Sequence, residues 1–180
     1  MGELTGHRPT LPQILLSVRH HLPRSPRHDA GVLFHDLSLS ELIHLSAGVD
    51  RPRAVDLDTV EGMTPDAAAL AFLSDRLGIK IVITRRPALA LRAVELGLLP
   101  LLRIHCLDST GFERALEGHP GPPVGTAVSP GLILAHMAAD QRARLPEPIV
   151  ANGLMRSQED VAAALAAGAA AVVLEEASRP

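Results

Sequence analysis

Short apolar runs bounded by turn residues recur along the chain, and segments of helix length separate them. The clearest unit is the run Pro148–Ala151, a glycine turn at Asn152-Gly153, and a helix with Ser157 as N-cap and Asp160 in its first turn. This unit predicts a strand followed by a helix. Runs of the same kind predict further strands at Ala30–His35, Arg53–Asp58, Lys80–Thr84, Leu99–His105, Gly125–Val128 and Ala170–Leu174, with a weaker candidate near Thr10–Leu11.

Apolar residues spaced by three and four positions predict helices between these strands. The predicted helices cover Leu39–Leu45, Ala67–Leu77, Ala88–Leu96, Phe112–Leu116 and Leu132–Leu145. Strands that alternate with helices through short turns indicate a parallel sheet with right-handed crossovers. The number of strands favours an α/β fold of the compact, TIM-like (β/α)₈ barrel type, a single barrel domain over residues 1–180. An open doubly wound sheet is the alternative.

Chain length limits the size of the parts of such a barrel. About 250 residues is typical of the fold, whereas this chain has 180. We therefore expect short helices, short loops and no helix after the last strand.

Composition fits a globular protein with an aliphatic core, because 47% of the residues are apolar and there are three Phe but no Trp or Tyr. No apolar run is long enough to span a bilayer, and the N-terminus lacks a signal-type apolar stretch. The expected location is therefore the cytoplasm, with no membrane partner. Cys106 is the only cysteine, which excludes an internal disulfide, and its apolar surroundings favour a core residue over a nucleophile.

The N-terminal segment 1–28 is basic and interrupted by prolines, and we expect it to include the weak first strand. Between His7 and His28 it carries four histidines and no acidic residue. The net charge of −3 gives no attraction of the whole molecule to nucleic acid. The segment is read either as a solvated, irregular stretch or as an arm that binds a polyanion. In the second reading Arg8, Arg19, Arg24 and Arg27 contact RNA.

Acidic residues lie at the end of the predicted strand Arg53–Asp58 and directly after it. Strand alternation sends Asp56 and Asp58 to the same side, where Glu61 joins them. Together with His35-Asp36 and His105 at neighbouring strand ends, these groups suggest a metal site or an acid/base pair. The alternative is structural: Asp58 or Thr59 caps the next helix and Asp56 pairs with an arginine.

Arginines occur at three other strand ends, as Arg85, Arg103 and Arg156. Because an unpaired guanidinium is costly to bury in an apolar strand, Arg103 is expected to be largely buried and to pair with a carboxylate, Asp56, Asp58 or Glu61, or with an anion. A planar guanidinium also recognises phosphate. Asp108 or Ser109 is expected to cap the helix at Phe112–Leu116. The chain has no Walker loop, no GxGxxG, no zinc pattern and no nucleophile motif.

The order of several short motifs resembles the glycerol uptake operon antiterminator family over nearly the full chain, from Pro12 to Ser178. The motifs are Asp58-Thr59-Val60-Glu61-Gly62-Met63, Thr84-Arg85, Arg103 with Leu107-Asp108-Ser109, Pro130-Gly131-Leu132-Ile133, and Gly153-Leu154-Met155-Arg156 with Glu159-Asp160-Val161.

The resemblance implies a barrel that senses glycerol 3-phosphate and binds leader messenger RNA to prevent transcription termination. Such a protein regulates glycerol metabolism, is not an enzyme, and has no cofactor, metal or catalytic residue. The expected partners are glycerol 3-phosphate or a related small phosphate, leader RNA and further copies of the chain. The ligand-binding residues implied are Asp58, Glu61, Thr84, Arg85, Arg103, Gly131, Gly153 and Arg156.

Some positions depart from the pattern of that family. Asp56 stands where the family has a histidine, Ala127 replaces a glutamate and Asn152 replaces a glycine, while Leu174, Glu175 and Glu176 replace small hydroxyl residues. Because carboxylates repel phosphate, we expect weaker phosphate binding than in family members with hydroxyl residues there. The alternatives are a small barrel enzyme, a metal-dependent lyase or aldolase-like catalyst using Asp56, Asp58, Glu61 and His105, and a scaffold that has lost the site.

Overall fold

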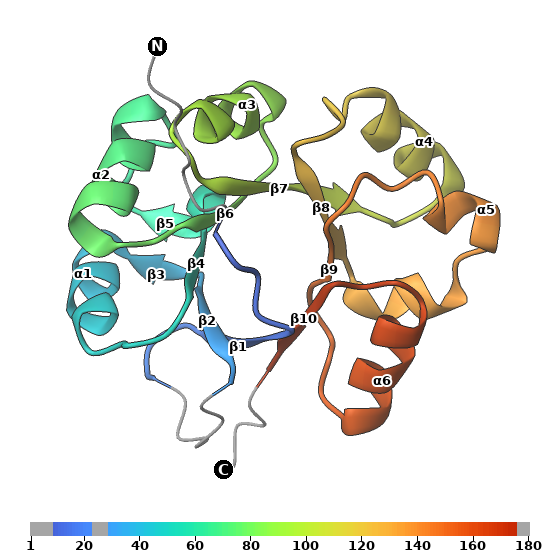
Figure 1. Cartoon of the computed structure of the whole chain (residues 1–180), viewed down its shortest axis with the longest axis horizontal. Coiled ribbons are helices and arrows are strands. Elements are labelled where there is room, and N and C mark those ends of the chain that lie inside the picture. Colours follow the sequence, from blue (N-terminus) through green and yellow to red (C-terminus); the bar gives the residue numbers. More distant parts are fainter. Residues whose placement is uncertain (1–8, 23–28, 176–180) are drawn as a thin grey trace.

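The computed structural model describes residues 9–22 and 29–175, and in it eight parallel strands close into a barrel. Figure 1 shows this ring with the helices packed around its outside. The closed barrel is therefore confirmed, and the open sheet is wrong. Around the ring the strands are β1 (Ile14–Val18), β10 (Ala171–Leu174), β9 (Ile149–Ala151), β8 (Gly125–Ser129), β7 (Leu99–His105), β6 (Ile81–Thr84), β4 (Arg53–Asp56) and β2 (Gly31–Phe34).

Short helices connect the strands, which explains how this barrel is built from fewer residues than is typical. The longest of them has 11 residues. Two further strands, β3 (Leu37–Ser38) and β5 (Val60–Glu61), form a separate parallel ladder beside the barrel. The helices are α1 (Leu39–Ala47), α2 (Ala67–Leu77), α3 (Pro87–Glu95), α4 (Ser109–Glu117), α5 (Ala139–Arg142) and α6 (Gln158–Ala166), with 3₁₀ helices η1 (Leu57–Thr59) and η2 (Gly131–His136).

The first strand lies later in the chain than the sequence pattern predicted. The expected position near Thr10–Leu11 is wrong, because the strand that closes the barrel is Ile14–Val18. Leu15 is in register with Val173 of β10 on one side and with Gly31 of β2 on the other. A short apolar run has the same pattern in a buried strand and in a buried helix, so pairing with both neighbours decides its structure. The prediction that no helix follows the last strand concerns residues 176–180, which lie outside the described residues.

The predicted helix Leu132–Leu145 is also wrong, because it is divided into η2 and α5. Met137 and Ala138 between them are extended, with φ/ψ of −68°/145° and −62°/149°. The Met137 side chain is buried in the core, and the Arg142 guanidinium donates a hydrogen bond to the Met137 carbonyl oxygen. Helical spacing continues through this break, so the sequence pattern does not reveal it.

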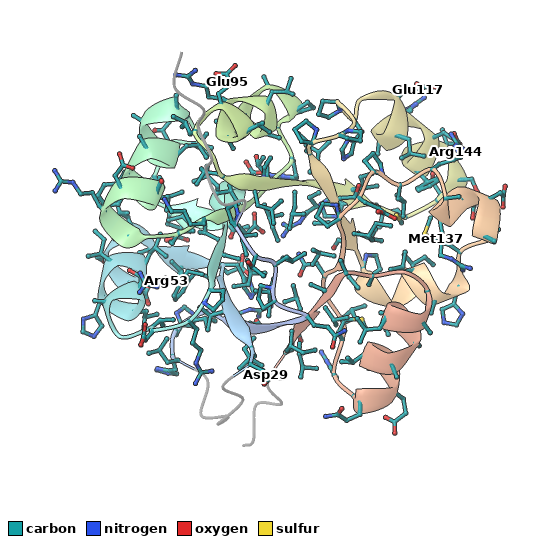
Figure 2. All side chains as sticks on the ribbon, viewed as in Figure 1. Asp29, Arg53, Glu95, Glu117, Met137 and Arg144 are labelled. Carbon is teal, nitrogen blue, oxygen red and sulfur yellow. The ribbon has the colours of Figure 1, made fainter. Side chains whose placement is uncertain are left out.

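Side chains fill the barrel interior (Figure 2). Because side chains alternate along a strand, every second residue of a barrel strand points inward. One buried cluster contains Leu15, Leu33, Ala54 and Leu101 from four different strands. Two residues further along the same strands, on the same side, lie Ser17, His35, Asp56 and Arg103. The aliphatic interior is therefore followed by a layer of polar side chains at the carboxyl ends of the strands, which we call the barrel mouth.

Most of the longer helices begin at a side-chain cap. The side chains of Ser38, Asp66, Asp108 and Ser157 accept hydrogen bonds from backbone N–H groups in the first turns of α1, α2, α4 and α6. The N-cap of α3 is Arg86, which makes no side-chain capping bond. Pro87 begins α3 and has no N–H group, so the N–H groups of the next residues in the first turn lack a side-chain cap next to the end of β6.

Candidate functional site

The residues expected to form the site follow strands that point the same way. Asp58 follows β4, Arg85 follows β6, Arg103 lies near the end of β7, and Gly153 follows β9. Since the strands are all parallel, their carboxyl ends meet at the barrel mouth. The prediction that these four residues lie at one mouth is confirmed.

Arg103 and Asp56 form an ion pair inside the mouth, between Nη2 and Oδ2. The side chain of Asp56 is 2% exposed and that of Arg103 is 12% exposed. The prediction that Arg103 is largely buried and paired with a carboxylate is therefore confirmed. Burial raises the pKa of Asp56 above its ordinary value, while the positive charge of Arg103 opposes this increase.

Asp58 organises the loop between β6 and α3. Its Oδ2 accepts hydrogen bonds from the Thr84 hydroxyl (3.1 Å) and the Arg85 backbone N–H (2.5 Å), and its Oδ1 accepts from Nε of Arg86 (3.2 Å). Nε of Arg85 lies 3.7 Å from the same carboxylate. The side chain of Asp58 is 2% exposed, whereas those of Arg85 and Arg86 are 61% and 59% exposed. A buried anion thus holds two guanidinium groups at the rim of the mouth.

The alternative prediction, that Asp58 or Thr59 caps the next helix, is wrong.

 The next helix, α2, is capped by Asp66 instead, whose Oδ1 accepts from the Ala69 N–H (2.9 Å). Thr59 donates its hydroxyl to the Asp56 carbonyl oxygen and accepts from the Asp36 N–H. Asp58 therefore fixes the rim of the mouth, and Thr59 fixes the loop after β2.

His35 lies between two partners at the ends of β1 and β2. Its Nδ1 donates to the Asp36 carboxylate (2.9 Å), and its Nε2 lies 2.6 Å from the Ser17 hydroxyl. Asp36 is also within 3.7 Å of Nε of Arg19. His105, at the end of β7, is exposed, and partial burial with the positive charges of Arg103 and Arg85 lowers its pKa. Polar side chains thus continue around the mouth.

Two glycines and an ion pair shape the part of the mouth formed by β8, β9 and β10. Gly153 has a φ of +89°, which favours glycine. The N–H of Gly131 donates to the carbonyl oxygens of Asn152 and Gly153, so Gly131 joins two loops. Nε of Arg156 lies 3.6 Å from Oε2 of Glu175, and these side chains are 70% and 28% exposed. Glu175 therefore already faces a guanidinium.

Not every predicted residue reaches the mouth. Glu61 is exposed on β5, paired in register with Ser38 in the separate ladder, so it does not converge with Asp56 and Asp58. Within residues 9–22 and 29–175 no group of three or more His, Cys, Asp or Glu side chains is arranged to hold a metal ion. Of the four arginines expected to contact RNA, Arg19 is described and 54% exposed, while Arg8, Arg24 and Arg27 lie outside the described residues.

Three residues of the mouth were not among the expected ligand contacts. Arg86 was missed, although the adjacent pair Arg85-Arg86 directly after a strand is a usable signal. Ser17 was missed because its strand was placed too early in the chain. His35 was considered only for a metal or acid/base site.

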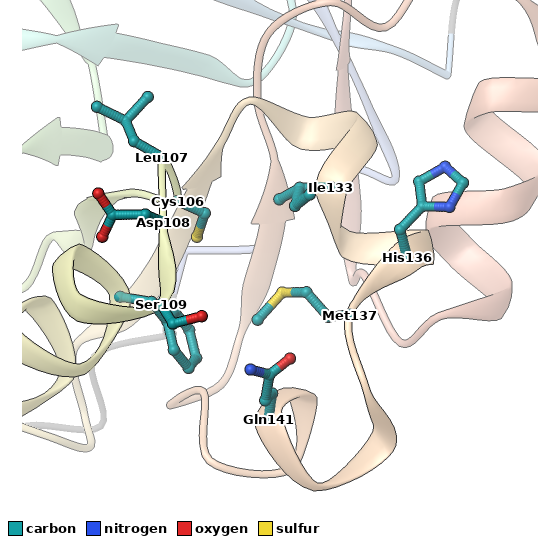
Figure 3. A pocket seen from close by; sticks show the side chains of 9 residues that line it. Cys106, Leu107, Asp108, Ser109, Ile133, His136, Met137 and Gln141 are labelled. Carbon is teal, nitrogen blue, oxygen red and sulfur yellow. The ribbon is translucent and has the colours of Figure 1, made fainter.

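A pocket lies between the β7–α4 loop and the segment from η2 to α5, which follow β7 and β8 (Figure 3). Its volume is about 200 Å³. Cys106 lines it, and burial raises the pKa of the thiol. A protonated thiol is a poor nucleophile, which agrees with the expected structural role of this cysteine. Asp108 also lines the pocket and accepts from the Gly111 N–H, so it is the expected cap of α4.

The fold is that of a small TIM-like barrel with arginines gathered at its mouth. The model of the glycerol-3-phosphate responsive antiterminator family matches residues 31–178, and the chain belongs to this family. The resemblance seen in the short motifs is thereby confirmed. Members of this family are regulators, so the chain is not assigned an enzymatic role, and the lyase or aldolase alternative has no support from the comparison.

Two solved structures share the fold. The glycerol uptake operon antiterminator regulatory protein from Listeria monocytogenes strain 4b F2365 has 20% identity and a TM-score of 0.69, covering 82% of this chain and 81% of that one. A glycerol uptake operon antiterminator-related protein from Thermotoga maritima MSB8 has 24% identity and a TM-score of 0.66, with 82% and 84% covered. A comparison with curated proteins gives no match. Among the described helices, none combines the length and apolar character needed to cross a membrane.

Proposed function

We propose that this chain is a regulator that binds glycerol 3-phosphate, or a related small phosphate ester, at the barrel mouth and acts on leader messenger RNA to prevent transcription termination in the cytoplasm. Family membership supports the regulatory role. The observation that carries the ligand proposal is the excess of positive charge at the loop between β6 and α3. Arg85 and Arg86 share the single carboxylate of Asp58, whereas Arg19, Arg103 and Arg156 each face a carboxylate of their own.

The phosphate group fits best at this loop. Arg85 and Arg86 are more than half exposed, so their remaining donors are available to an anion. The uncapped amide groups at the start of α3 add a partial positive charge at the same place. Arg103, Gly153 and Arg156 complete the proposed contacts across the mouth. Asp58 and Thr84 position the loop, and the N–H of Gly131 is already used by the neighbouring loop.

The ligand proposal is tested by calorimetry with glycerol 3-phosphate on the wild type and on Arg85→Gln/Arg86→Gln. The double variant should bind at least about tenfold more weakly, because charged hydrogen bonds to phosphate contribute about 1.5–3 kcal/mol each. Arg92→Gln is the matched control, because Arg92 lies on α3, the helix after this loop, pairs with Glu95 and has a side chain that is 52% exposed. No binding by the wild type rejects the ligand proposal, and equal binding by the double variant rejects this loop as its place.

The RNA proposal is supported by the basic N-terminal segment and needs a separate test. A mobility-shift experiment compares the leader RNA of the glycerol uptake operon with a scrambled RNA, with and without glycerol 3-phosphate. The combined Gln variant of Arg8, Arg19, Arg24 and Arg27 should bind more weakly and show a smaller salt dependence, because phosphate contacts release counterions. Equal affinity for both RNAs under all conditions rejects antitermination through this leader.

A further inference from the structure

The Asp56–Arg103 pair leaves two polar atoms without a partner. Within the described residues, Oδ1 of Asp56 and Nε of Arg103 are the two buried side-chain nitrogen or oxygen atoms that make no hydrogen bond. The other carboxylate oxygen and the Nη2 of the guanidinium are used by the ion pair itself. Buried polar groups are nearly always hydrogen-bonded in folded proteins. Two exceptions on one ion pair at the mouth therefore mark a place where a polar group can bind.

The chemistry of the two atoms defines that partner. Oδ1 of an ionised carboxylate only accepts hydrogen bonds, and Nε of arginine only donates. A group that satisfies both must donate one hydrogen bond and accept another, which a hydroxyl does. A phosphate offers acceptors only and is repelled by the carboxylate, and an ammonium group offers donors only.

We infer that Asp56 and Arg103 bind an alcohol hydroxyl of the ligand, so that the mouth selects phosphate esters with a free hydroxyl on a short carbon chain. This inference rests on the proposed function, because it uses the loop of Arg85 and Arg86 for the phosphate end. β6, which carries that loop, lies between β4 and β7, which carry the pair. The two ends of one small ligand thus contact adjacent strand ends, the phosphate at the rim and the hydroxyl inside.

The test compares two ligands that differ only in their hydroxyl groups. Calorimetry measures the binding of glycerol 3-phosphate and of n-propyl phosphate, which has the same number of carbons and no hydroxyl. The wild type should bind glycerol 3-phosphate at least about tenfold more tightly, because a site that hydrogen-bonds a hydroxyl discriminates strongly against an analogue without it. Equal affinity for both esters overturns the inference and leaves the proposed function standing.

The variant Asp56→Leu/Arg103→Met removes both atoms without leaving an unpaired charge. In this variant the preference for glycerol 3-phosphate over n-propyl phosphate should be lost. Glu113→Gln/Arg144→Met is the matched control, because it removes an exposed arginine–carboxylate pair outside the mouth. If Asp56→Leu/Arg103→Met keeps the preference for glycerol 3-phosphate, the hydroxyl is bound elsewhere and the inference is overturned.

A second measurement needs no phosphate and therefore separates the inference from the proposed function. Glycerol is titrated into the labelled protein while backbone amide resonances are followed by NMR. In the wild type the resonances at residues 55–58 and 102–105 should shift, and in Asp56→Leu/Arg103→Met they should not. If neither ester binds but glycerol causes these shifts, the proposed function fails and the hydroxyl site stands. Without the shifts in the wild type, the hydroxyl site is rejected.

Discussion

Arg103 and Asp56 join two strands that are not neighbours in the barrel. Arg103 lies on β7 and Asp56 on β4, and β6 runs between them. The pair therefore crosses the carboxyl end of β6 and covers the aliphatic interior beneath it. Because both charges are withdrawn from water, each depends on the other for compensation.

The single variant Arg103→Met should be strongly destabilised. It leaves the carboxylate of Asp56 buried without its cation, and breaking a buried pair in this way costs about 3–5 kcal/mol. Urea unfolding followed by circular dichroism measures the change in the free energy of unfolding. The double variant Asp56→Leu/Arg103→Met is the control and should recover most of this loss. An unchanged free energy of unfolding in the single variant would show that the carboxylate is compensated by another group.

The variant Gly131→Ala should be destabilised by crowding between two loops of the mouth. A Cβ atom at Gly131 would lie 2.8 Å from the Asn152 backbone nitrogen and 2.9 Å from the Ala151 carbonyl carbon. Backbone atoms do not move aside easily, and overpacking of this kind costs about 1–3 kcal/mol. Gly118→Ala is the control, because its nearest neighbours would lie at 3.6 Å and 3.8 Å. Thermal unfolding that is equal in both variants would contradict the expected crowding.

Much of the fold was predictable because local signals agree with it. A few adjacent residues determine the structure of several elements: the capping motif at Ser157 and Asp160, and the apolar runs of β4, β6 and β7. The position of β1 was not predictable in this way, because Ile14–Val18 is fixed by pairing with β10 and β2, which are distant in sequence. The extended residues at Met137 and Ala138 are likewise fixed by packing rather than by spacing.

The part of the site that could be predicted is the ion pair of a buried charged side chain. Arg103 sits in an apolar strand, so its partner had to be a carboxylate or an anion, and Asp56 is that partner. Alternation failed beyond the end of β4, because Asp58 lies in η1 and Glu61 on β5 rather than on one continuous strand. The hydrogen-bond network of Ser17, His35 and Asp36 depends on the position of β1 and therefore could not be predicted from the sequence.

Acid should weaken the start of α1 through Glu41. The hydrogen bond from the Ser38 backbone N–H, followed by that from the Ser38 hydroxyl, lowers the pKa of Glu41 from 4.5 to about 2. Because the pKa is lower in the folded state, the stabilisation is present above pH 4.5 and is lost as the pH falls through about 2. In Glu41→Gln the unfolding free energy should therefore fall less on acidification, while the capping box is retained at neutral pH.

Urea unfolding at several pH values from 2 to 5 measures this difference, since the range brackets the shift of Glu41. Glu61→Gln is the control substitution, because Glu61 is exposed on β5 outside the cap. An acid dependence that is identical in the wild type and in Glu41→Gln would contradict the role of this carboxylate.

The variant Glu175→Ser should bind glycerol 3-phosphate more tightly than the wild type. Glu175 lies 3.6 Å from Nε of Arg156, so it competes with a ligand for this guanidinium and also repels the phosphate. A like charge at about 4 Å costs roughly 1 kcal/mol in water, so we expect an increase in affinity of about fivefold. Calorimetry on both proteins measures it, with Glu117→Ser on the outer helix α4 as control (Figure 2). Weaker binding by Glu175→Ser would instead mean that Glu175 holds Arg156 in the position that the ligand requires.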